Sequence, residues 1–599
     1  MLELAFSTFA GKVRVSCDLA SAKSLQALSS RYATSTAINQ LTFELELDDL
    51  LANLVELAHW PEHDPNVRWQ KELLQLVEGN AADTSVLQSM LANKDAAVDA
   101  PSVHLDSAWI GPLTEFQQQN IQKLLRLLHG ANFSVPGAGK TRVTLAVFQA
   151  RRLAGEVRRM LIVCPKSAYE SWQSEAKECF ADAPRVAIMD TAIPPAADIV
   201  LINYERLPDA RPSLSAWLRS QPALLVLDEA HRMKLGPLGA WGAACLALGP
   251  YAVRRMILSG TPAPNGAKDL ENLFSFVWPG LGKNEVIRAL AGNDLRQAST
   301  RLQPLFVRTT KKQLDLPPID ITVRRIELPP LHRELYNALV GQVSARFRGQ
   351  EDDVESLGKV LLYLLMAATT PALLAVGSSP HEPLPYRVPP LLPPPNSSLN
   401  ELMRDLPQYE LSPKFQEVVK IVAANAEQGR KTLVWSTFVR NLKSLESLLS
   451  RFRPAVIHGG TEDRDKELSR FRNDPSCFVL LSNAATLGEG VSLHQDCHDA
   501  VYVDRDFSAG RFLQSVDRIH RLGLPKDTET RVTVLSANQT IDELVEQRLK
   551  MKLDFMGGVL DDPAVLALSD LDEEPSAAIG MDYGDLASLI GYLSSHASS

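Results

Sequence analysis

The sequence has few of the features that mark a secreted, disulfide-stabilised or membrane-spanning protein. Its 599 residues contain only six cysteines, and no two of them form a Cys-x-x-Cys pair. Neither a disulfide framework nor a zinc knuckle is therefore expected, and the thiols are predicted to be reduced and buried. No apolar run is as long as a membrane span, and the N-terminus lacks a basic stretch followed by an apolar core. The sequence predicts a soluble, cytoplasmic protein without a membrane partner.

The chain also lacks an excess of positive charge. Its 62 Lys and Arg face 71 Asp and Glu, which gives a formal net charge of −9. This balance argues against a simple basic coat for nucleic acid, although it says little about one local groove. The 45% of hydrophobic residues is enough for several buried cores. For a chain of this length, roughly three to five domains are expected.

Two series of short apolar segments predict an α/β protein. The first series lies in residues 106–285 and the second in residues 401–555, and helical segments separate the members of each. Such strands are typical of a parallel sheet covered by helices on both faces, with active loops at the carboxyl ends of the strands. The predicted strands are 160–164, 198–202, 224–227, 255–258, 432–435, 455–458, 478–481, 500–503 and 532–535.

Three further regions differ in composition. Residues 1–105 are predicted to form an accessory domain of unknown role, in which several leucines have helical spacing. Residues 286–400 are predicted to be a helical and proline-rich linker, since proline recurs from 381 to 396. Residues 556–599 are predicted to be a mobile acidic tail without Lys or Arg. The accessory domain and the tail are the expected sites for protein partners.

A glycine-rich segment at 134–141 predicts a phosphate-binding loop. It reads Ser-Val-Pro-Gly-Ala-Gly-Lys-Thr and is followed by helical apolar spacing. In such a loop, N–H groups at a helix N-terminus face phosphate oxygens, the lysine reaches the β- and γ-phosphates, and the threonine hydroxyl ligates Mg²⁺. Ser134 replaces the first glycine of the strict pattern, so taken alone the segment is equally well a helix cap in a glycine-rich turn. The expected nucleotide contacts are Pro136, Gly137, Ala138, Gly139, Lys140, Thr141 and Arg142.

An acidic segment at the end of an apolar strand supports this interpretation. The strand 224–227 leads directly into Asp228 and Glu229. Asp228 is placed to hold Mg²⁺, and Glu229 to polarise the attacking water. The alternative is an acidic helix N-terminus, which Asp and Glu also favour. After the next strand, residues 259–262 form a hydroxyl-rich turn that is a candidate for coupling nucleotide state to domain movement.

Two arginines near the end of the second series predict the other half of an ATP site. Arg518 and Arg521 are three residues apart, and we expect them on one helical face. There they would act as fingers that stabilise charge on the transferred phosphoryl group, an effect on the order of 10³ to 10⁵ in rate. The alternative is a solvated basic helix end. Because the arginines and the loop lie in different predicted domains, hydrolysis is expected to open and close a cleft between them.

In this order, the motifs resemble the superfamily 2 helicase-like ATPases, and within them the Swi/Snf-type double-stranded-DNA translocases. The resemblance covers roughly residues 110–555. The element at 514–523 is similar to the QxxxRxHRxG form of that group and differs from the QRxGRxGR form common in RNA helicases, which favours duplex DNA over RNA. The other matching segments are 113–117, 161–167, 228–234, 258–265, 305–311, 316–318, 433–438, 458–460 and 481–490.

This resemblance implies two RecA-like domains in tandem and ATP-dependent stepping along duplex DNA without unwinding, with ATP and Mg²⁺ bound. It implies that Gln117 reads adenine and that Gly490 contacts the nucleotide. Contacts to the DNA backbone position such a protein without reading bases. By position, the implied backbone contacts are Pro165, Lys166, Asn203, Tyr204, Thr437, His458, Asn483, Ala484 and Thr486.

The chain departs from the family pattern at three places. Residues 134–136 read Ser-Val-Pro where the family usually has Asp-Glu-Met, Leu524 stands in place of Gln after Gly523, and Ser492 stands where Asn is frequent. None of these changes removes a catalytic group. The middle insertion is short and no histone-reading module is visible. We therefore expect a bacterial or phage-related setting, such as DNA repair or antiviral defence, and not chromatin remodelling.

Two alternatives remain open at this point. An RNA or single-stranded-DNA helicase would need stacking aromatics along its channel and a strand-splitting hairpin. A nucleotide-gated clamp or recruitment subunit would need only ATP binding, and the unusual residues 134–136 are its one support.

Overall fold

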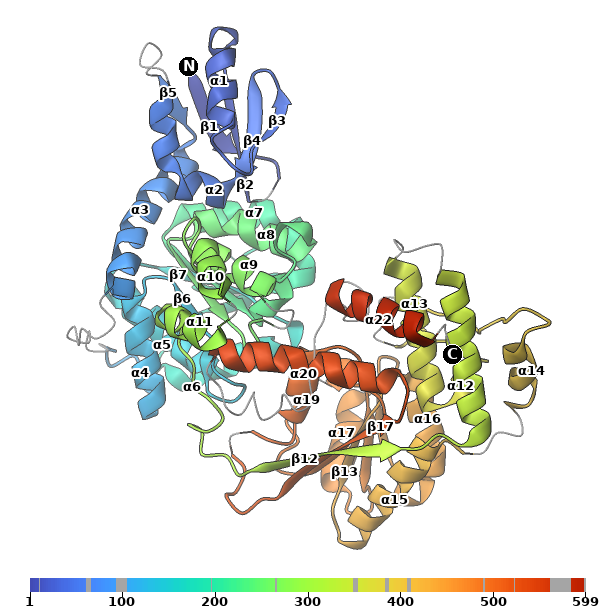
Figure 1. Cartoon of the computed structure of the whole chain (residues 1–599). Coiled ribbons are helices and arrows are strands. Elements are labelled where there is room, and N and C mark those ends of the chain that lie inside the picture. Colours follow the sequence, from blue (N-terminus) through green and yellow to red (C-terminus); the bar gives the residue numbers. More distant parts are fainter. Residues whose placement is uncertain are drawn as a thin grey trace. The chain divides into compact units, whose positions relative to one another are not determined.

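The computed structural model describes residues 1–9, 11–60, 66–92, 105–194, 196–263, 267–292, 294–347, 354–382, 387–406, 411–487, 491–521, 523–560 and 583–596. The chain divides into two compact units (Figure 1). Unit 1 comprises Met1–Thr310 with Gly558–Asp561, and unit 2 comprises Lys311–Gly557 with Asp562–Ser599. No helix in the described ranges is long and apolar enough to cross a membrane.

Unit 1 begins with a five-stranded mixed sheet. Its order is β3-β4-β2-β1-β5, and only β1 and β5 run parallel. The sequence predicted helical spacing here and missed this sheet, whose strands are short and alternate: Leu2, Leu4, Val13 and Val15 are fully buried between more exposed neighbours. The elements are β1 (Leu2–Phe6), β2 (Lys12–Cys17), α1 (Ala22–Ser29), β3 (Thr36–Asn39), β4 (Thr42–Glu46), α2 (Leu47–Ala52), β5 (Val67–Trp69) and α3 (Lys71–Ala92).

The second part of unit 1 is a six-stranded parallel sheet of order β6-β11-β10-β7-β9-β8. Its central strands are buried along their length because they are almost continuously apolar. The strands are β6 (Gly130–Asn132), β7 (Arg159–Val163), β8 (Val186–Ile188), β9 (Ile199–Ile202), β10 (Ala223–Asp228) and β11 (Arg254–Leu258). The helices are α4 (Glu115–Arg126), α5 (Lys140–Leu153), α6 (Tyr169–Cys179), α7 (Leu207–Ser220), α8 (Ala240–Leu248), α9 (Ala267–Val277), α10 (Gly282–Leu290) and α11 (Leu295–Leu302).

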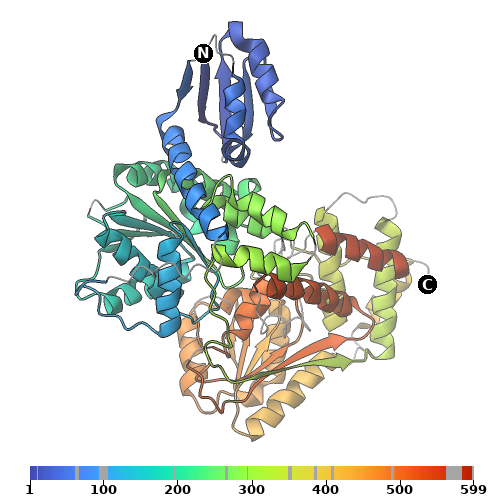
Figure 2. The same cartoon turned by 60° about the vertical axis from the view of Figure 1, so that its left-hand side comes forward.

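The N-terminal sheet is fixed to this parallel-sheet part. Figures 1 and 2 show α3 running from the N-terminal sheet along the parallel-sheet part. Asp48 accepts a hydrogen bond from the backbone N–H of Gly280 at 2.6 Å, and the buried side chain of Asn80 donates to the carbonyl of Pro279 at 2.6 Å. Three ion-pair or histidine contacts join the same two parts: Glu46–Lys283, Glu72–Arg219 and Asp83–His129.

Unit 2 contains a second six-stranded parallel sheet, of order β12-β17-β16-β13-β15-β14. Its strand β12 comes from the region predicted to be a linker and pairs with β17 over its whole length. The strands are β12 (Ile319–Ile326), β13 (Thr432–Trp435), β14 (Ala455–Ile457), β15 (Val479–Ser482), β16 (Asp499–Tyr502) and β17 (Thr530–Ala537). The associated helices are α15 (Pro413–Glu427), α16 (Val439–Leu448), α17 (Arg464–Asn473), α18 (Ala484–Leu487), α19 (Ala509–Val516) and α20 (Ile541–Leu560).

A helical layer completes unit 2. It consists of α12 (Pro330–Phe347), α13 (Val354–Thr369), α14 (Ser398–Arg404) and α22 (Tyr583–His596). The helix α22 packs on α12 and α13 and buries Leu589 and Leu593. The prediction of a mobile acidic tail is therefore wrong for residues 583–596, because these apolar side chains anchor that segment in the core. Residues 561–582 lie outside the described residues.

The predicted α/β class with two parallel-sheet domains is confirmed, and all nine predicted strands are present. In the described part of 381–396 there is no helix or strand, as the prolines predict. Three strands of the parallel sheets were not predicted: β6, β8 and β12.

Candidate active site

Three neighbouring strands of the first parallel sheet end beside one another. The order β6-β11-β10 places their carboxyl ends along one edge. The loop 134–141 follows β6, Ser259 follows β11, and Asp228 is the last residue of β10. Ligands of open parallel sheets bind at this edge. The structure therefore brings the glycine-rich loop, the acidic segment and the hydroxyl-rich turn together within unit 1.

The glycine-rich loop leads directly into α5. Gly137 (φ 85°) and Gly139 (φ 76°) have left-handed backbone conformations, which glycine adopts without steric cost. Helix α5 begins at Lys140, whose Nζ atom donates to the carbonyl oxygen of Ser134 at 2.9 Å. The lysine side chain thus spans the loop from its end to its beginning, at a helix N-terminus that favours a phosphate.

Ser134, the unusual residue of the loop, has a structural role. Its backbone N–H donates to Oδ1 of Asn132 at 3.0 Å, and its Oγ accepts a hydrogen bond from the backbone N–H of Thr309 at 2.9 Å. The hydroxyl of Thr309 in turn accepts from the side chain of Asn120 at 2.9 Å. These bonds hold the segment around 307–309 against the loop. The serine therefore replaces glycine without closing the phosphate cradle.

Gln117 touches the loop from the first turn of α4. Its Oε1 accepts the backbone N–H of Thr114 at 3.0 Å, and its Nε2 donates to the carbonyl of Ala138 at 3.3 Å. A Cβ atom on Gly139 would lie 2.3 Å from that Nε2. The glutamine is thus placed beside the loop, and its implied contact with adenine stays a prediction.

Asp228 is held in position by two aromatic side chains. Its Oδ2 accepts the indole N–H of Trp172 at 2.9 Å, and its carbonyl accepts the hydroxyl of Tyr204 at 2.8 Å. Both aromatic rings are buried, whereas Asp228 is partly exposed. Hydrogen bonds from two buried side chains therefore fix the orientation of Asp228, while part of this residue is exposed to solvent.

Glu229 and His231 link the acidic segment to the turn after β11. Glu229 has a left-handed backbone (φ 48°), an uncommon conformation for a residue with a side chain. The Nδ1 atom of His231 lies 3.4 Å from Oε2 of Glu229 and 3.3 Å from Oγ of Ser259. Burial, together with the charges of Lys234, Arg232 and Lys140, lowers the pKa of His231 to about 3. The imidazole is therefore neutral at physiological pH, and it forms no ion pair with Glu229 at their separation of 3.4 Å.

The turn 259–261 approaches the loop closely. A Cβ atom on Gly260 would lie 2.9 Å from Cδ of Pro136, and the N–H of Thr261 donates to the hydroxyl of Ser259 at 3.2 Å. Ser259 thus contacts both its own turn and His231. This arrangement joins the loop, the acidic segment and the turn into one cluster of contacting residues.

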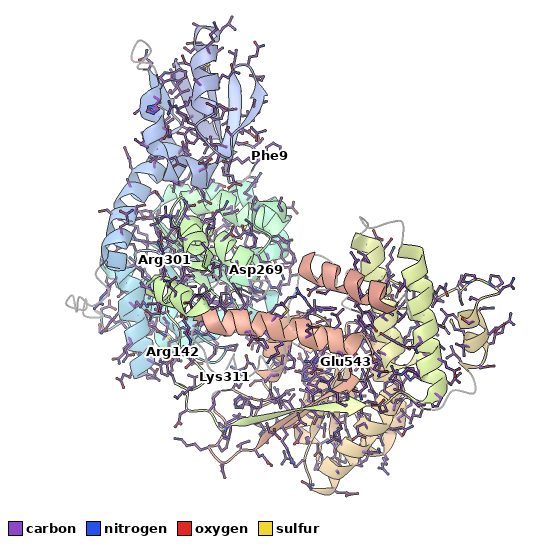
Figure 3. The ribbon with its side chains drawn as sticks, in the orientation of Figure 1. Phe9, Arg142, Asp269, Arg301, Lys311 and Glu543 are labelled. Atoms are coloured by element: carbon purple, nitrogen blue, oxygen red, sulfur yellow. The ribbon has the colours of Figure 1, made fainter. Side chains whose placement is uncertain are left out.

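Arg142 is engaged with α6. It pairs with Glu175 and with Glu178, the latter at 3.2 Å, and it donates to the carbonyl of Pro112 at 3.2 Å. Figure 3 labels its position. These bonds tie α5 to α6, so the predicted nucleotide contact of Arg142 has no support in this arrangement.

The two arginines of the second sheet domain differ from each other. Helix α19 ends at Val516, so Arg518 and Arg521 lie in the turns beyond it, and the expected shared helical face is wrong. Arg518 is 8% exposed, and its guanidinium donates to the carbonyls of Gln514 at 2.9 Å and Val491 at 2.8 Å. Arg521 is partly exposed, and its side chain makes no hydrogen bond or ion pair among the described residues. Arg518 therefore braces the segment at Val491, and Arg521 is the arginine available to a ligand.

In unit 2, four neighbouring strands also end at one edge. Asp504, Thr437, Asn483 and His458 follow the strands β16, β13, β15 and β14 in the order of the sheet. Asp504 is buried, which raises its pKa, and it accepts hydrogen bonds from Ser436 at 2.5 Å and from the N–H of Thr437 at 2.7 Å. Thr437, His458, Ala484 and Thr486 are partly exposed. Gly490 lies outside the described residues.

Asn483 has an unusual environment. It is 1% exposed, and neither its Nδ2 nor its Oδ1 has a hydrogen-bond partner among the described residues. It lines a cavity of about 30 Å³ together with Thr437, Asp504 and Arg511. A buried amide without partners is costly unless water or a ligand satisfies it. The carboxyl edge of this sheet therefore has unused hydrogen-bonding capacity.

The candidate DNA contacts of unit 1 are mostly internal. Pro165, Asn203 and Tyr204 are buried, and Asn203 accepts the hydroxyl of Tyr169 at 3.3 Å. Tyr204 does not fit the predicted contact with the DNA backbone, because it is 0% exposed and its hydroxyl donates to the carbonyl of Asp228. Lys166, at the start of a short turn of 3-10 helix, is the exposed member of this set.

Sequence reasoning assigned no individual role at the site to Trp172 and Thr309, and it named Ser259 only as part of the hydroxyl-rich turn 259–262. Each acts through a contact with a residue far away in the chain, and no local pattern marks such a partner. For Trp172, the one signal is an aromatic residue on the helix that follows a central strand, which is also typical of an ordinary core residue.

Two family models match the chain. Residues 133–369 match the SNF2-related domain, and residues 413–523 match the helicase conserved C-terminal domain. The first match contains the loop, the acidic segment and the turn after β11. The second contains Thr437, His458, Asn483, Arg518 and Arg521.

Several known proteins are similar. The TATA-binding protein-associated factor mot1 of Aspergillus fumigatus is 26% identical over 544 residues, which cover 77% of this chain and 27% of that protein. The SWI/SNF-related matrix-associated actin-dependent regulator of chromatin subfamily A member 1 of Homo sapiens is 24% identical over 479 residues, which cover 74% of this chain and 43% of that protein. The solved Sulfolobus solfataricus SWI2/SNF2 ATPase core in complex with dsDNA aligns with 79% of this chain and 99% of that one, at 21% identity and a TM-score of 0.34.

The chain thus spans less than half the length of these two curated relatives. In order along the chain, a region similar to the SNF2-related domain is followed by a region similar to the helicase conserved C-terminal domain.

Proposed function

We propose that this protein is an ATP-dependent translocase that steps along double-stranded DNA. The observation that carries the proposal is the cluster at the edge of the first sheet, where Lys140, Asp228 and Ser259 follow three adjacent strands. A lysine in a glycine-rich loop, a carboxylate oriented by Trp172 and a second carboxylate beside a neutral histidine are the groups that phosphoryl transfer from ATP requires.

The residues of unit 1 fit a nucleotide and Mg²⁺. Gly137 and Gly139 bring no side chain into the turns of the loop, so its N–H groups and the Lys140 ammonium can surround phosphate oxygens. Thr141 and Asp228 are partly exposed and would hold the ion, since Mg²⁺ is usually bound through one or two protein oxygens with phosphates and water. When bound, the ion neutralises charge on the phosphates.

Glu229 is the proposed general base. It is partly exposed, and its left-handed backbone directs it away from the path of β10. Because His231 is neutral, its ring lies 3.4 Å from Glu229 without cancelling the negative charge of the carboxylate. A charged carboxylate at this position can accept a proton from the attacking water.

The residues of unit 2 supply the remaining proposed roles. Arg521 stabilises the transferred phosphoryl group, and Arg518 positions the segment that contains Val491. Thr437, His458, Asn483, Ala484 and Thr486 are proposed contacts to the DNA backbone, together with Lys166 of unit 1. The unsatisfied amide of Asn483 supports a polar ligand at this edge.

The biological setting is part of the proposal. The similar proteins of Aspergillus fumigatus and Homo sapiens are named for association with TATA-binding protein and for regulation of chromatin. We infer a role in bacterial DNA repair or antiviral defence from the short middle segment.

The test is the rate of ATP hydrolysis without nucleic acid and with duplex DNA, single-stranded DNA or RNA, each at low and at moderate salt. Selective stimulation by duplex DNA, weaker at higher salt through counterion release, is the expected result, and the variant Lys140→Ala should abolish it. Stronger stimulation by RNA or single strands would overturn the proposal. A clamp would instead bind duplex DNA in an ATP-dependent way without turnover; its one support is weakened, because Ser134 has a structural role.

A further inference from the structure

A cavity of about 220 Å³ lies within unit 1, where the N-terminal sheet meets α7 and α8. One wall is formed by residues 6–9, 11 and 12 with Leu47, and the other comes from α7, α8 and the turn at 250–251. Figure 3 labels Phe9 at this junction. The cavity is remote in sequence from the loop, the acidic segment and the arginines, so none of the roles proposed above uses it.

The two walls are held at a fixed distance. Asp48 binds the N–H of Gly280 at 2.6 Å, and Glu46 pairs with Lys283 at 2.7 Å. Asn80, which is buried, donates to the carbonyl of Pro279. Because these bonds already join the two parts, a ligand would not have to order the walls, and preorganisation of this kind favours binding.

The cavity has an aromatic lining. Phe6 and Tyr251 face each other edge to face, with ring centroids 6.3 Å apart and an interplanar angle of 70°. Phe9 is 66% exposed at the rim. Leu47 and Leu246 complete the apolar surface. Such a lining favours an apolar, ring-bearing group.

Two cations lie at the same cavity. Lys12 and Arg211 line it, and within the described part of the chain their side chains make no ion pair or hydrogen bond. On the neighbouring strand β4, Glu44 pairs with Arg14 and accepts a hydrogen bond from Ser7 at 2.5 Å, and Glu46 pairs with Lys283. The positive charges at this rim are therefore available to a carboxylate of a ligand, and an arginine suits a carboxylate because it can form two parallel hydrogen bonds.

The size of the cavity limits the ligand. A cavity of about 150 Å³ holds a benzene molecule, whereas pockets for whole small molecules measure roughly 300 to 1,000 Å³. The 220 Å³ found here fits one ring-bearing side chain. A buried aromatic anchor of this kind is typical of a protein–protein contact.

We propose that this cavity binds a peptide segment of a partner protein through one aromatic side chain flanked by carboxylates, which pair with Lys12 and Arg211. A nucleic acid is a poorer match. Residues 1–92 carry twelve Asp and Glu against six Lys and Arg, and this negative field opposes a long polyanion more strongly than a peptide with two carboxylates. The cavity is thus a recruitment site on the face of unit 1.

The experiment measures binding of the whole protein to three short peptides by isothermal titration calorimetry at low salt. The probes are acetyl-Asp-Trp-Asp-amide, its neutral form acetyl-Asn-Trp-Asn-amide and its ring-less form acetyl-Asp-Ala-Asp-amide. We expect the first to bind roughly three- to tenfold more tightly than either control, the size expected from exposed charge pairs and one anchored ring. Equal binding of the three peptides, or no binding of any at millimolar concentration, would overturn the proposal.

Substitutions at the cavity test whether the peptides bind there. Arg211→Gln should remove the preference for the acidic over the neutral peptide, and Phe9→Ser should weaken both tryptophan peptides. Leu238→Ser, at a residue that is 93% exposed and does not line the cavity, is the matched control and should change nothing. Unchanged basal ATP turnover shows that each variant is folded. Tighter binding of an oligothymidylate than of the acidic peptide, lost in Phe9→Ser, would instead assign the cavity to nucleic acid.

Discussion

At the scale of single residues, the orientation of Asp228 depends on one indole. Trp172 donates its only N–H to Oδ2 of Asp228 at 2.9 Å, and its ring is 2% exposed. The rest of the ring is buried in unit 1. The hydrogen bond and the packing of this residue can therefore be separated by a substitution that keeps a ring.

Trp172→Phe should lower kcat for ATP hydrolysis about tenfold, the size expected for losing a hydrogen bond to a charged group. Trp109→Phe is the control, because its N–H donates to the carbonyl of Gly111 at 2.7 Å, away from Asp228. Steady-state turnover and melting temperature should be measured for both. An equal loss of activity in the two variants would indicate a general packing effect and not the positioning of Asp228.

Gly139 combines a left-handed backbone with a close contact to Gln117. Gly139→Ala should raise the Kd for ATP by roughly tenfold or more, since strain of this kind costs on the order of 1 to 3 kcal/mol and the new Cβ would displace Gln117. Gly155 has nearly the same φ (74°), but no atom lies within 4 Å of the place that a Cβ would occupy there. Gly155→Ala therefore introduces the backbone strain without the steric clash, and the Kd of this variant for ATP should match that of the wild type.

At the scale of elements, α22 is held by one buried carboxylate. Asp585 is 0% exposed and pairs with Lys552 at 2.5 Å and with Arg548. Asp585→Asn would remove the buried charge that pairs with these two cations, so the free energy for opening α22 should fall by about 2 to 4 kcal/mol. Hydrogen exchange of residues 583–596 measures this free energy directly.

The matched control is the exposed pair Asp315–Lys526, in which the side chains are 74% and 79% exposed. Asp315→Asn should change stability by no more than about 0.5 kcal/mol, because exposed ion pairs contribute little. Asp315 has a left-handed backbone (φ 52°), which Asn also tolerates. Similar protection of α22 in the wild type and in Asp585→Asn would show that Leu589 and Leu593 alone anchor the helix.

Glu382, near the start of the proline-rich stretch, gives unit 2 a pH dependence. Glu382 accepts hydrogen bonds from the N–H groups of Ser379 at 2.8 Å and Val439, the first residue of α16, at 3.1 Å. Burial raises the pKa of Glu382 from 4.5 to about 7, and the charge of Asp504 acts in the same direction while Arg440 opposes the shift. Between these two pH values the folded chain keeps a proton that the unfolded chain has released, so stability falls as pH rises through this window and is constant above it.

The variant Glu382→Gln has no titrating group at this position, so its stability should not fall through this pH window. The difference in melting temperature between Glu382→Gln and the wild type should be small at pH 5, increase in favour of the variant up to pH 7 and then stay constant. Thermal unfolding in steps of half a pH unit measures it. A difference that does not change between pH 5 and 7 would show that the carboxylate is already ionised in the folded chain.

At the scale of the whole molecule, the sequence predicted the elements whose signal is local. The nine predicted strands are nearly continuous apolar runs, and all are present. β12 was missed because it alternates between exposed and half-buried residues at the edge of its sheet, and β6 because Gly130–Asn132 has no β-branched residue. The glycine-rich loop and the acidic segment were also predicted, because each is recognised from consecutive residues in the sequence.

The contacts that orient the candidate site could not be predicted in this way. Trp172 with Asp228, Ser134 with Thr309 and Arg518 with Val491 are pairs that only the folded chain brings together. The two arginines were expected to be equivalent, because their spacing suits a helix. The end of α19 at Val516 makes them different, and this difference can be measured.

The binding loop belongs to unit 1 and Arg521 to unit 2, so ATP binding and ATP hydrolysis should respond differently to substitutions in the two units. Arg521→Ala should leave the Kd for ATP nearly unchanged and lower kcat by roughly 10³-fold, because a finger acts on charge that develops in the transition state. Lys140→Ala should weaken binding as well. Arg521→Lys keeps the charge but not the planar fork and should recover little activity. Equilibrium binding of a fluorescent ATP analogue and turnover with duplex DNA separate the two effects. Normal turnover in Arg521→Ala would show that unit 2 contributes no charge to the reaction and would assign hydrolysis to the groups of unit 1 alone.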